Sequence, residues 1–292
     1  MIIRVPATSA NLGCGFDSVG FAVNLYLELE ILKPSNKWEI VHELGSDIPC
    51  DESNLIITTA LSIAPDLPPH KISMTSGIPL TGGLGSSSSA LVAGIELACV
   101  LGKLELSVQE KLDIACPMEG HPDNVAPAIL GGLVIGTYSN GYLDYIKSNI
   151  PDVGLVVYVP NYRLNTSAMR KILPHDLPYS EAVLASSISN VMVAALVSGD
   201  MAKAGHMMER DMLHEKYRIA LVPDLEKVRC CARKHGAYAT YLSGAGSAIM
   251  CIVPPDKTDE IADALSKLGD SRVMKLLIEP DGAHVLNFKP LS

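Results

Sequence analysis

The chain has 292 residues, of which 48% are hydrophobic and 19% are charged, and its formal net charge at pH 7 is −9. This length and composition are typical of a globular protein with one large domain or two ordinary ones. The acidic balance disfavours a nucleic-acid surface, and a bound polyanion would need local compensation, for which a divalent cation is the simplest source.

The N-terminal region is predicted to contain two strands joined by a polar loop. Residues 2–5 form a short strand that Pro6 stops, and residues 19–32 alternate apolar and polar side chains as a half-buried strand does. A partner strand is expected at 38–43. The loop between the first two strands carries Asn11 and Asp17 as its polar points. From spacing alone, its simplest interpretation is an Asx-type turn.

A helix is predicted at residues 55–64, with Ser53 or Asn54 near its N-terminus. A strand at 71–76 and an apolar helical run at 90–101 then flank the most informative stretch, Pro79-Leu80-Thr81-Gly82-Gly83-Leu84-Gly85-Ser86-Ser87-Ser88-Ser89. A strand, a glycine-rich loop and a helix in this order direct free backbone N–H groups at an anion. We therefore expect a phosphate cradle. The alternative is a plain turn in which the serines cap a buried helix.

This cradle contains no cation, because no Lys or Arg occurs between Lys71 and Lys103. A phosphate here must be held by backbone amides and the helix dipole, with a metal to neutralise the remaining charge. The stretch has no lysine after its glycines, as a Walker loop requires, and it matches neither the G-x-G-x-x-G fingerprint nor the G-x-S-x-G elbow.

A second polar cluster, Glu119-Gly120-His121-Pro122-Asp123-Asn124, follows a helix predicted from a capping box at Ser107 and Glu110. As a helix cap, Asp123 and Asn124 would be ordinary. A carboxylate, an imidazole and an amide between two apolar helices indicate a site only if another polar loop can meet them.

The best candidate domain boundary lies at residues 149–152, which divides the chain into 1–150 and 151–292. Beyond it, strands at 153–159, 238–242, 248–253 and 273–278 and helices at 181–197, 200–208, 224–234 and 256–268 indicate an antiparallel α+β layer. The helix at 181–197 is rich in small residues and is expected to be buried. A second glycine loop, Ser243-Gly244-Ala245-Gly246-Ser247, joins two of the strands.

The seven cysteines are odd in number and form no C-x-x-C pair, so neither a disulfide framework nor a zinc ribbon is indicated. Several lie in apolar runs, where a free thiol packs as a small hydrophobe; this is typical of a reducing compartment. Cys14, within the N-terminal loop, is expected only to pack there. The N-terminus lacks the apolar centre of a signal peptide, and no apolar run reaches membrane-spanning length. We expect a cytoplasmic protein.

Three motifs occur in a fixed order: Thr8 to Asp17, the cradle, and Ser243 to Gly246. Together they resemble the GHMP small-molecule kinases, over essentially the whole chain, and the resemblance implies that the other loops converge on the cradle. The match is closest to members that act on homoserine, through the loop that begins at Thr8 and through His121-Pro122-Asp123-Asn124-Val125-Ala126-Pro127. Two departures are a Ser247 where the family usually has proline and a short loop between Glu119 and His121.

The resemblance implies an α+β fold with an N-terminal nucleotide domain and a ferredoxin-like C-terminal domain. It implies transfer of the ATP γ-phosphoryl group to the side-chain hydroxyl of L-homoserine, a step of threonine biosynthesis, with Mg²⁺ as cofactor and a homodimer as assembly. The implied ATP site is the cradle with Asn54, the implied magnesium ligands are Ser87 and Glu119, and Gly244 and Gly246 support the cradle. No general base is assigned, and Asp123 is the candidate. The implied substrate residues are Asn11, Asp17, His121, Asn124, Thr166, Arg170 and Arg218.

The chemistry of these residue types agrees with a zwitterionic substrate. Its carboxylate calls for a guanidinium fork, from Arg170 and Arg218, and its ammonium for oxygens, from Asp17 and Asn11. From the residues alone, both arginines could equally be solvated surface charges. Two other functions stay open: a kinase for another alcohol such as mevalonate, which lacks an ammonium, and a non-catalytic nucleotide- or RNA-binding module.

Overall fold

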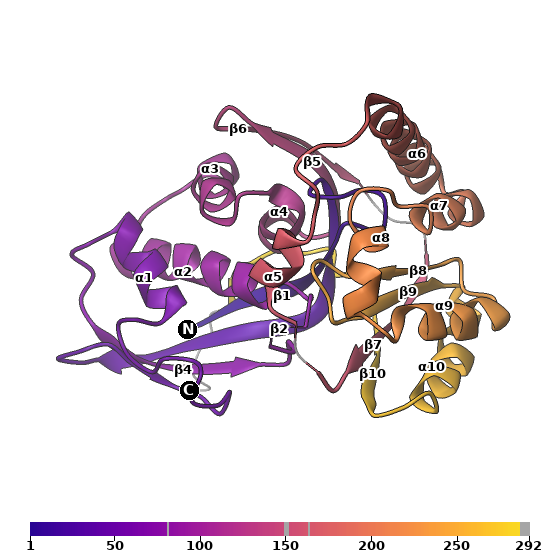
Figure 1. Cartoon of the computed structure of the whole chain (residues 1–292). Coiled ribbons are helices and arrows are strands. Elements are labelled where there is room, and N and C mark those ends of the chain that lie inside the picture. The colour runs from indigo at the N-terminus through magenta and orange to yellow at the C-terminus, as the bar shows by residue number, and fades with distance from the viewer. Residues whose placement is uncertain (81, 149–151, 163, 287–292) are drawn as a thin grey trace.

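The computed structural model of the chain describes residues 1–80, 82–148, 152–162 and 164–286. Within this part, the fold is built on two sheets, each with helices against it (Figure 1). The larger sheet has the strand order β11-β1-β2-β4-β3, with β5 pairing to β2 and β6 pairing to β5. The smaller has the order β10-β7-β9-β8. The expected α+β class is confirmed.

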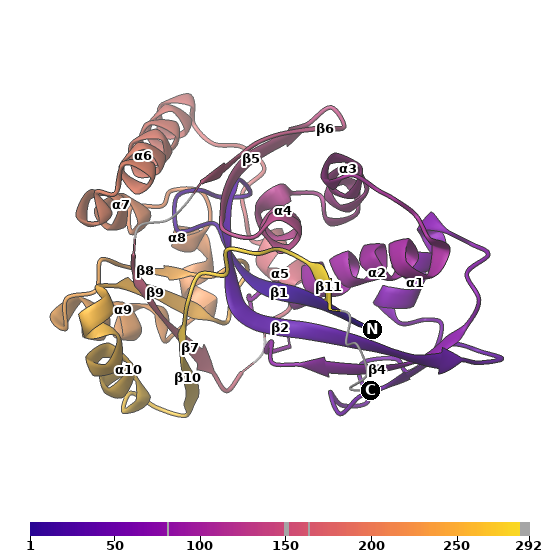
Figure 2. The same cartoon turned by 180° about the vertical axis from the view of Figure 1, so that it is seen from behind.

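The larger sheet is formed mainly by the first half of the chain. Its strands are β1 (Ile2–Ala10), β2 (Val19–Pro34), β3 (Glu39–Val41), β4 (His70–Ser76), β5 (Leu133–Ser139), β6 (Tyr142–Ser148) and β11 (His284–Leu286). Among the described strands of this sheet, β3 and β4 pair in parallel and the other pairs are antiparallel. Four helices gather on one face of this sheet (Figures 1 and 2): α1 (Leu55–Ile63), α2 (Ser86–Gly102), α3 (Val108–Glu119) and α4 (Pro122–Leu130).

The smaller sheet is fully antiparallel and consists of β7 (Gly154–Pro160), β8 (Ala239–Leu242), β9 (Ile249–Val253) and β10 (Ser271–Leu276). On one face, strand residues such as Val156 and Cys251 pack with α9 (Leu225–Lys234) and α10 (Thr258–Ser266) in a core of their own. Residues on the other face, such as Val157 and Met250, join the main core. The remaining helices of this half are α5 (Thr166–Lys171), α6 (Tyr179–Ser198), α7 (Met201–Met208) and α8 (Glu215–Arg218).

The predicted division of the chain at residue 150 stays a prediction. The two sheets fall on either side of it, except that β11 pairs with residues 2–4 of β1 and Ile278 bridges to Val23. The end of the described chain therefore returns to the sheet formed by its beginning.

The prediction that Pro6 stops the first strand is wrong, because β1 continues to Ala10. Proline lacks the N–H that a strand with two neighbours would need. On one side of β1, Pro6 lies opposite Tyr26 of β2, and the register shifts directly after it. On the other side of β1, β11 pairs only with residues 2–4 and does not reach Pro6. Its missing donor therefore interrupts no ladder. The added length brings Thr8 against Asn124 and Ser9 against Ser243, two residues of loops that form the site.

The helix expected to be buried, α6, lies at the edge of the molecule (Figures 1 and 2). One side is buried, through residues such as Ile188 and Met192, but Val183, Val191 and Val197 are each about half exposed. By length and composition alone, α6 is long and apolar enough to cross a membrane. In its most apolar stretch of 18 residues, 28% is buried within the protein. This also corrects the expectation that no apolar run is long enough. A single such helix is weak evidence for a membrane span.

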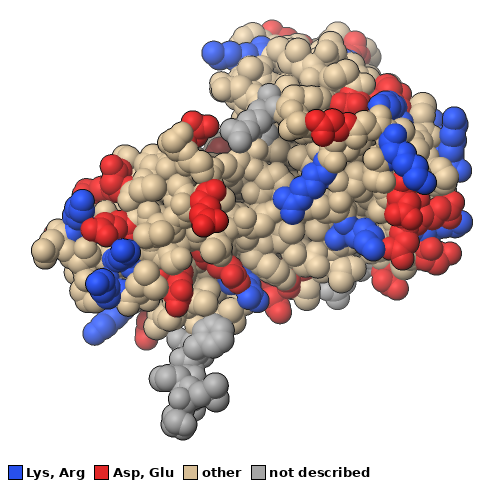
Figure 3. Space-filling view, turned by 90° about the horizontal axis from the view of Figure 1, so that it is seen from below, with Lys and Arg blue, Asp and Glu red and all other residues tan. Residues whose placement is uncertain are grey.

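On the face shown in Figure 3, acidic and basic side chains are interspersed over much of the surface. The buried thiols of Cys14, Cys116 and Cys251 are free, as the sequence predicts. Burial raises the pKa of Cys14 to about 12, so this thiol packs in the loop and is not ionised at neutral pH.

Candidate active site

The three glycine-rich or polar loops predicted to converge do meet, at the N-terminus of α2. The backbone N–H of Thr8 donates to the carbonyl of Leu84 over 3.2 Å, and that of Ala248 donates to the carbonyl of Gly82 over 2.9 Å. The Ser243 hydroxyl donates to the carbonyl of Gly83 over 2.7 Å. Hydrogen bonds thus tie the cradle directly to segments near both ends of the chain.

Two cradle glycines are required by these contacts. Gly83 and Gly85 have φ of +76° and +69°, a region that other residues rarely adopt. A Cβ on Gly83 would lie 2.2 Å from the carbonyl oxygen of Ser243, and one on Gly85 would lie 2.0 Å from Oγ1 of Thr8. The loop is therefore glycine-rich because neighbouring loops press against it, and not only because it turns.

Among the described residues, the N-cap of α2 provides no side-chain hydrogen bond to the start of the helix. This N-cap is Gly85, and the serines lie inside the first turn. The alternative in which the serines cap the helix is therefore wrong. Backbone N–H groups at such a terminus have no partner within the helix, and the helix dipole adds a partial positive charge. Because no Lys or Arg lies between residues 71 and 103, this end of α2 suits an anion held by backbone groups.

A serine and a carboxylate meet beside this terminus, but the serine is Ser88. Its hydroxyl donates to Oε1 of Glu119 over 2.8 Å, and it is almost fully buried. Ser87 is exposed and lines the same cleft. Hydroxyl and carboxylate oxygens are the hard ligands that Mg²⁺ prefers. The residues present therefore fit a magnesium ion at Glu119, with Ser88 as the serine in contact with that carboxylate.

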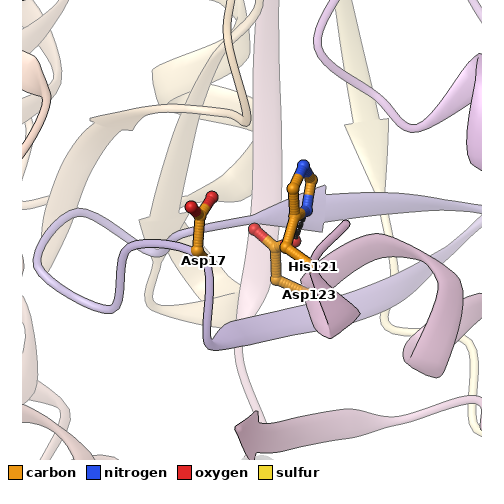
Figure 4. A group of neighbouring side chains, drawn as sticks. All are labelled: Asp17, His121 and Asp123. Atoms are coloured by element: carbon orange, nitrogen blue, oxygen red, sulfur yellow. Dashed lines mark hydrogen bonds and ion pairs between the residues drawn. The ribbon is translucent and has the colours of Figure 1, made fainter. Parts of the chain in front are cut away.

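The opposite end of the site is charged. Nη1 of Arg170, on α5, donates to Oδ1 of Asp17 over 2.8 Å and lies 2.7 Å from Oδ2 of the same carboxylate. Nδ1 of His121 lies against Oδ1 of Asp123 in a short contact. Figure 4 shows Asp17 on the loop after β1, with His121 and Asp123 at the start of α4. Ligand atoms of these three lie within 4.8 Å of one another, but their contacts make them an ion-pair network rather than a free set of metal ligands.

Arg218 lies behind this group and is 2% exposed. Burial and the positive charge of Arg170 together lower the pKa of Arg218 to about 10, so it remains cationic at neutral pH. Burial lowers the pKa of His121, but the hydrogen bond and charge of Asp123, with the charges of Asp17 and Glu119, outweigh it, and the net pKa is raised.

Two predicted substrate residues mainly hold other parts of the site. The amide of Asn11 donates to the carbonyl of Gly244 over 3.0 Å and accepts from the backbone N–H of Asp17 over 3.0 Å. Oδ1 of Asn124 accepts from the hydroxyl of Thr8 over 2.8 Å. Asn54, predicted at the nucleotide, caps α1 through Ile56 and donates to the carbonyl of Pro49.

The phosphate and charged ends open into one cleft of about 810 Å³. A volume of this size is typical of small-molecule sites. Of the predicted residues, Pro79, Leu84, Ser89 and Gly246 support the cleft without lining it, and Thr81 lies outside the described residues. The predicted residues that line it are Asn11, Asp17, Asn54, Leu80, Gly82, Gly83, Gly85, Ser86, Ser87, Ser88, Glu119, His121, Asn124, Thr166, Arg170, Arg218 and Gly244, together with the candidate base Asp123.

Sequence reasoning missed the apolar wall of the cleft and one aromatic ring. Leu44, Ile48 and Met74 line the part beyond the cradle, and Phe16 lies among the charged residues. Phe16 stood inside the predicted N-terminal motif, next to Asp17, but no residue pattern distinguishes it from a packing side chain. Leu44 and Ile48 lie on the loop between β3 and α1, and Met74 lies on β4, so no local spacing reveals them.

Comparison with known families gives the class of this fold. The C-terminal GHMP kinase model matches residues 192–271, and the N-terminal domain model matches residues 54–132, which contain the cradle. A solved mevalonate kinase from Methanococcus jannaschii, at 18% identity and a TM-score of 0.72 over 95% of this chain and 98% of its own, shares the fold alone. The class is that of the GHMP kinases.

Within this class, the chain is similar to a homoserine kinase from Streptococcus thermophilus, at 51% identity over 98% of this chain and 100% of that protein. It is also similar to the solved homoserine kinase from Cytophaga hutchinsonii, with 29% identity and a TM-score of 0.85, over 98% of this chain and 97% of the other. The chain belongs to the homoserine kinase family of GHMP kinases.

Proposed function

We propose that the protein transfers the γ-phosphoryl group of ATP to the side-chain hydroxyl of L-homoserine, giving ADP and O-phospho-L-homoserine, a step of threonine biosynthesis. One observation carries the proposal: an open, cation-free helix N-terminus and a charged group with both signs line the same cleft. The first suits a polyphosphate and the second suits a zwitterionic amino acid.

The nucleotide lies with its phosphates at the cradle. Backbone N–H groups of the first turn of α2, beyond the N-cap Gly85, are the donors to the phosphate oxygens. The adenine lies in the apolar part of the cleft, between Leu44, Ile48 and Ile56. Asn54 supports this wall by holding the loop at Pro49.

Magnesium is held at Glu119, with Ser88 or the adjacent Ser87 as the hydroxyl ligand. Bound there, the ion would reduce the negative charge of the phosphates, which the cradle cannot do with side chains. The residues of the chain contribute the rest: the α2 terminus binds and orients the phosphates, and the charged end orients the acceptor.

The acceptor lies at the charged end. Its ammonium is bound by Asp17 and its carboxylate by Arg170 and Arg218, with His121 and Thr166 beside it. Because the side chains of Arg170 and Asp17 are 46% and 30% exposed, their ion pair contributes only about 0–1 kcal/mol. An incoming zwitterion can therefore exchange partners with this pair at small cost, its carboxylate facing the arginines and its ammonium facing Asp17.

No dedicated general base is part of the proposal. Asp123 is 2% exposed, and its carboxylate is in contact with His121. Asp123 therefore orients the imidazole ring and is not a free carboxylate that could accept the proton of the substrate hydroxyl. Phosphoryl transfer depends mainly on alignment and charge stabilisation, which the cradle and the charged end supply. Retention of most activity in Asp123→Asn is the expected result, and loss by several orders of magnitude would assign a base role to Asp123.

The test is an ATP-consumption assay over a panel of small alcohols, with and without Mg²⁺. ADP release is expected with L-homoserine and Mg²⁺. Turnover of mevalonate but not homoserine would replace the proposal by a kinase for another alcohol. ATP binding without ADP release for any alcohol would indicate a nucleotide-binding module.

We also propose that the protein is a homodimer and that it is cytoplasmic. A homodimer is supported by the exposed side of α6, where residues 182–199 carry no charged side chain. Two copies of such a helix can pack without burying a charge, which would be costly. A cytoplasmic location is supported by the free cysteines, among which Cys14, Cys116 and Cys251 are buried. Sedimentation equilibrium of the purified protein decides between monomer and dimer.

A further inference from the structure

A stacked pair of rings lies beneath the two arginines of the charged end. The rings of Phe16 and His214 are 5.0 Å apart between centroids and nearly parallel, with an interplanar angle of 22°. The guanidinium carbons of Arg170 and Arg218 lie 5.3 and 5.4 Å from the centroid of Phe16. Because an aromatic face attracts a cation, this ring holds both guanidinium groups near one place despite their mutual repulsion.

His214 is fully buried, and its hydrogen-bond partners fix which ring nitrogen donates and which accepts. Nε2 lies 2.9 Å from the carbonyl oxygen of Gly13, which can only accept, so Nε2 carries the proton. Nδ1 lies 3.1 Å from Nη1 of Arg218, which can only donate, so Nδ1 is the acceptor. Both ring nitrogens are therefore in use, and a carboxylate oxygen of Asp211 lies 3.8 Å from Nε2. The ring links the N-terminal loop to α8, the helix that carries Arg218.

The contacts of Arg218 leave one edge of its guanidinium for a ligand. Nε donates to the carbonyl of Met169 over 3.2 Å, and Nη1 donates to the carbonyl of Gly244 over 3.1 Å as well as to His214. Nη2 has no protein acceptor in the part of the chain that the structure describes. A guanidinium is planar, so fixing Nε and Nη1 also fixes the direction in which Nη2 donates.

We propose that His214 is a positioning residue: through Nδ1 and its stack on Phe16, it holds Arg218 in the orientation that binds the acceptor's carboxylate. It thereby contributes to selection of amino-acid acceptors over alcohols without a carboxylate. This inference rests on the proposed function, since it assigns a carboxylate to Arg218. His214 touches neither reacting group, so its effect lies in acceptor affinity and not in the rate of phosphoryl transfer.

Two substitutions separate the two nitrogens. In His214→Gln, the amide can still donate toward Gly13 but offers no acceptor at the position of Nδ1. In His214→Asn, the shorter side chain places its oxygen near Nδ1 and does not reach Gly13. Loss of one hydrogen bond to a charged group corresponds to about a tenfold change in affinity. We therefore expect KM for homoserine to rise about tenfold in His214→Gln, with partial recovery in His214→Asn.

A positioning role is distinguished from a merely structural one by comparing how the substitution changes the constants for homoserine with how it changes those for the other ligands. KM for ATP and kcat stay close to the unmodified values in His214→Gln, and so does the inhibition constant of 3-aminopropan-1-ol, which is homoserine without its carboxylate. The matched control is His206→Gln, at an exposed histidine on α7, which leaves all of these constants unchanged. Equal weakening of homoserine, 3-aminopropan-1-ol and ATP would overturn the inference.

A double-mutant cycle with Arg218→Lys completes the test, because residues that act through one another are not additive. The effect of His214→Gln on the homoserine KM is expected to disappear in the Arg218→Lys background. An effect of the same size in both backgrounds contradicts the inference. If Arg218→Lys alone leaves the homoserine KM unchanged, the carboxylate assignment of the proposed function fails instead. Should His214→Gln not fold, Phe16→Leu removes the stack and is expected to show the same split.

Discussion

The two ends of the cleft present different kinds of groups to a charged ligand. At the cradle, the donors are backbone N–H groups at the start of α2, and Gly83 and Gly85 are pressed against neighbouring loops. At the acceptor end, the groups are side chains, of which Asp17 and Arg170 are already paired. The difference teaches where each end is vulnerable: a backbone site is damaged by adding atoms, and a side-chain site by removing charge.

The largest expected effect comes from adding one methyl group at the cradle. In Gly85→Ala, the new Cβ would lie 2.0 Å from Oγ1 of Thr8, at a φ of +69°. The start of α2 must shift, which misaligns the phosphate donors. Removal of one oriented donor typically costs 100- to 1,000-fold, so we expect kcat/KM for ATP to fall by at least about 100-fold.

The matched control is Gly141→Ala, at a φ of +79° with no atom within 4 Å of the added Cβ. It carries the same backbone strain, of about 1–2 kcal/mol, in the turn between β5 and β6. We expect it to lower the melting temperature and leave kcat/KM unchanged. Equal kinetic losses in the two variants would show that strain, and not the cradle, governs the effect.

The second effect comes from removing charge at the acceptor end. Asp17→Asn keeps the shape but loses the anion that faces Arg170 and the proposed ammonium. Hydrogen bonds to charged groups contribute about 1.5–3 kcal/mol, so KM for homoserine should rise about 10- to 100-fold. Initial-rate kinetics with both substrates varied give the test. A rise in KM for ATP of similar size would break the separation between the two ends.

A smaller effect concerns His121, whose raised pKa reports the negative charge around it. A histidine whose pKa in the folded state lies above its unfolded value of about 6.5 contributes to the free energy of unfolding. This contribution is fully present below the unfolded pKa and is lost as pH rises through the folded pKa. The loss of unfolding free energy in His121→Gln should therefore be larger at about pH 6 than at about pH 9. Urea denaturation at both values measures it. A loss that grows with pH would contradict the assignment of a charged histidine.

The smallest effect on activity is expected outside the cleft. Val191, on the exposed side of α6, is 46% exposed, and Val108, on α3, is 47% exposed. If α6 forms the proposed dimer, Val191→Glu halves the mass found by sedimentation and leaves kcat per chain nearly unchanged, while Val108→Glu changes neither. A monomeric unmodified protein would remove the dimer from the account without affecting either end of the cleft.

The parts of the fold that depend on contacts between residues close in sequence could be predicted from the sequence. The capping box at Ser107 and Glu110 and the cap at Asn54 involve neighbours in the chain, and the structure has both. The convergence of the three loops was predicted through the family resemblance. Spacing alone could not give it, because the contacts join residues as distant as Gly83 and Ser243.

The rest depended on orientation and on what lies across from each element. Whether Ser87 or Ser88 faces Glu119 is set by the rotation of α2 about its axis, since adjacent helix residues point about 100° apart. An apolar helix such as α6 reads as buried, yet the sequence does not say that one side has no neighbour within the described chain. His214 is 198 positions from Phe16, so their stacking leaves no local signal.

The most direct test of the central claim is product analysis by phosphorus NMR with ATP, Mg²⁺ and L-homoserine. We expect one O-phospho-L-homoserine for each ADP formed, and no phosphorylated product from mevalonate. ADP formed together with free phosphate and no phosphohomoserine, or a phosphorylated product from mevalonate alone, would contradict it.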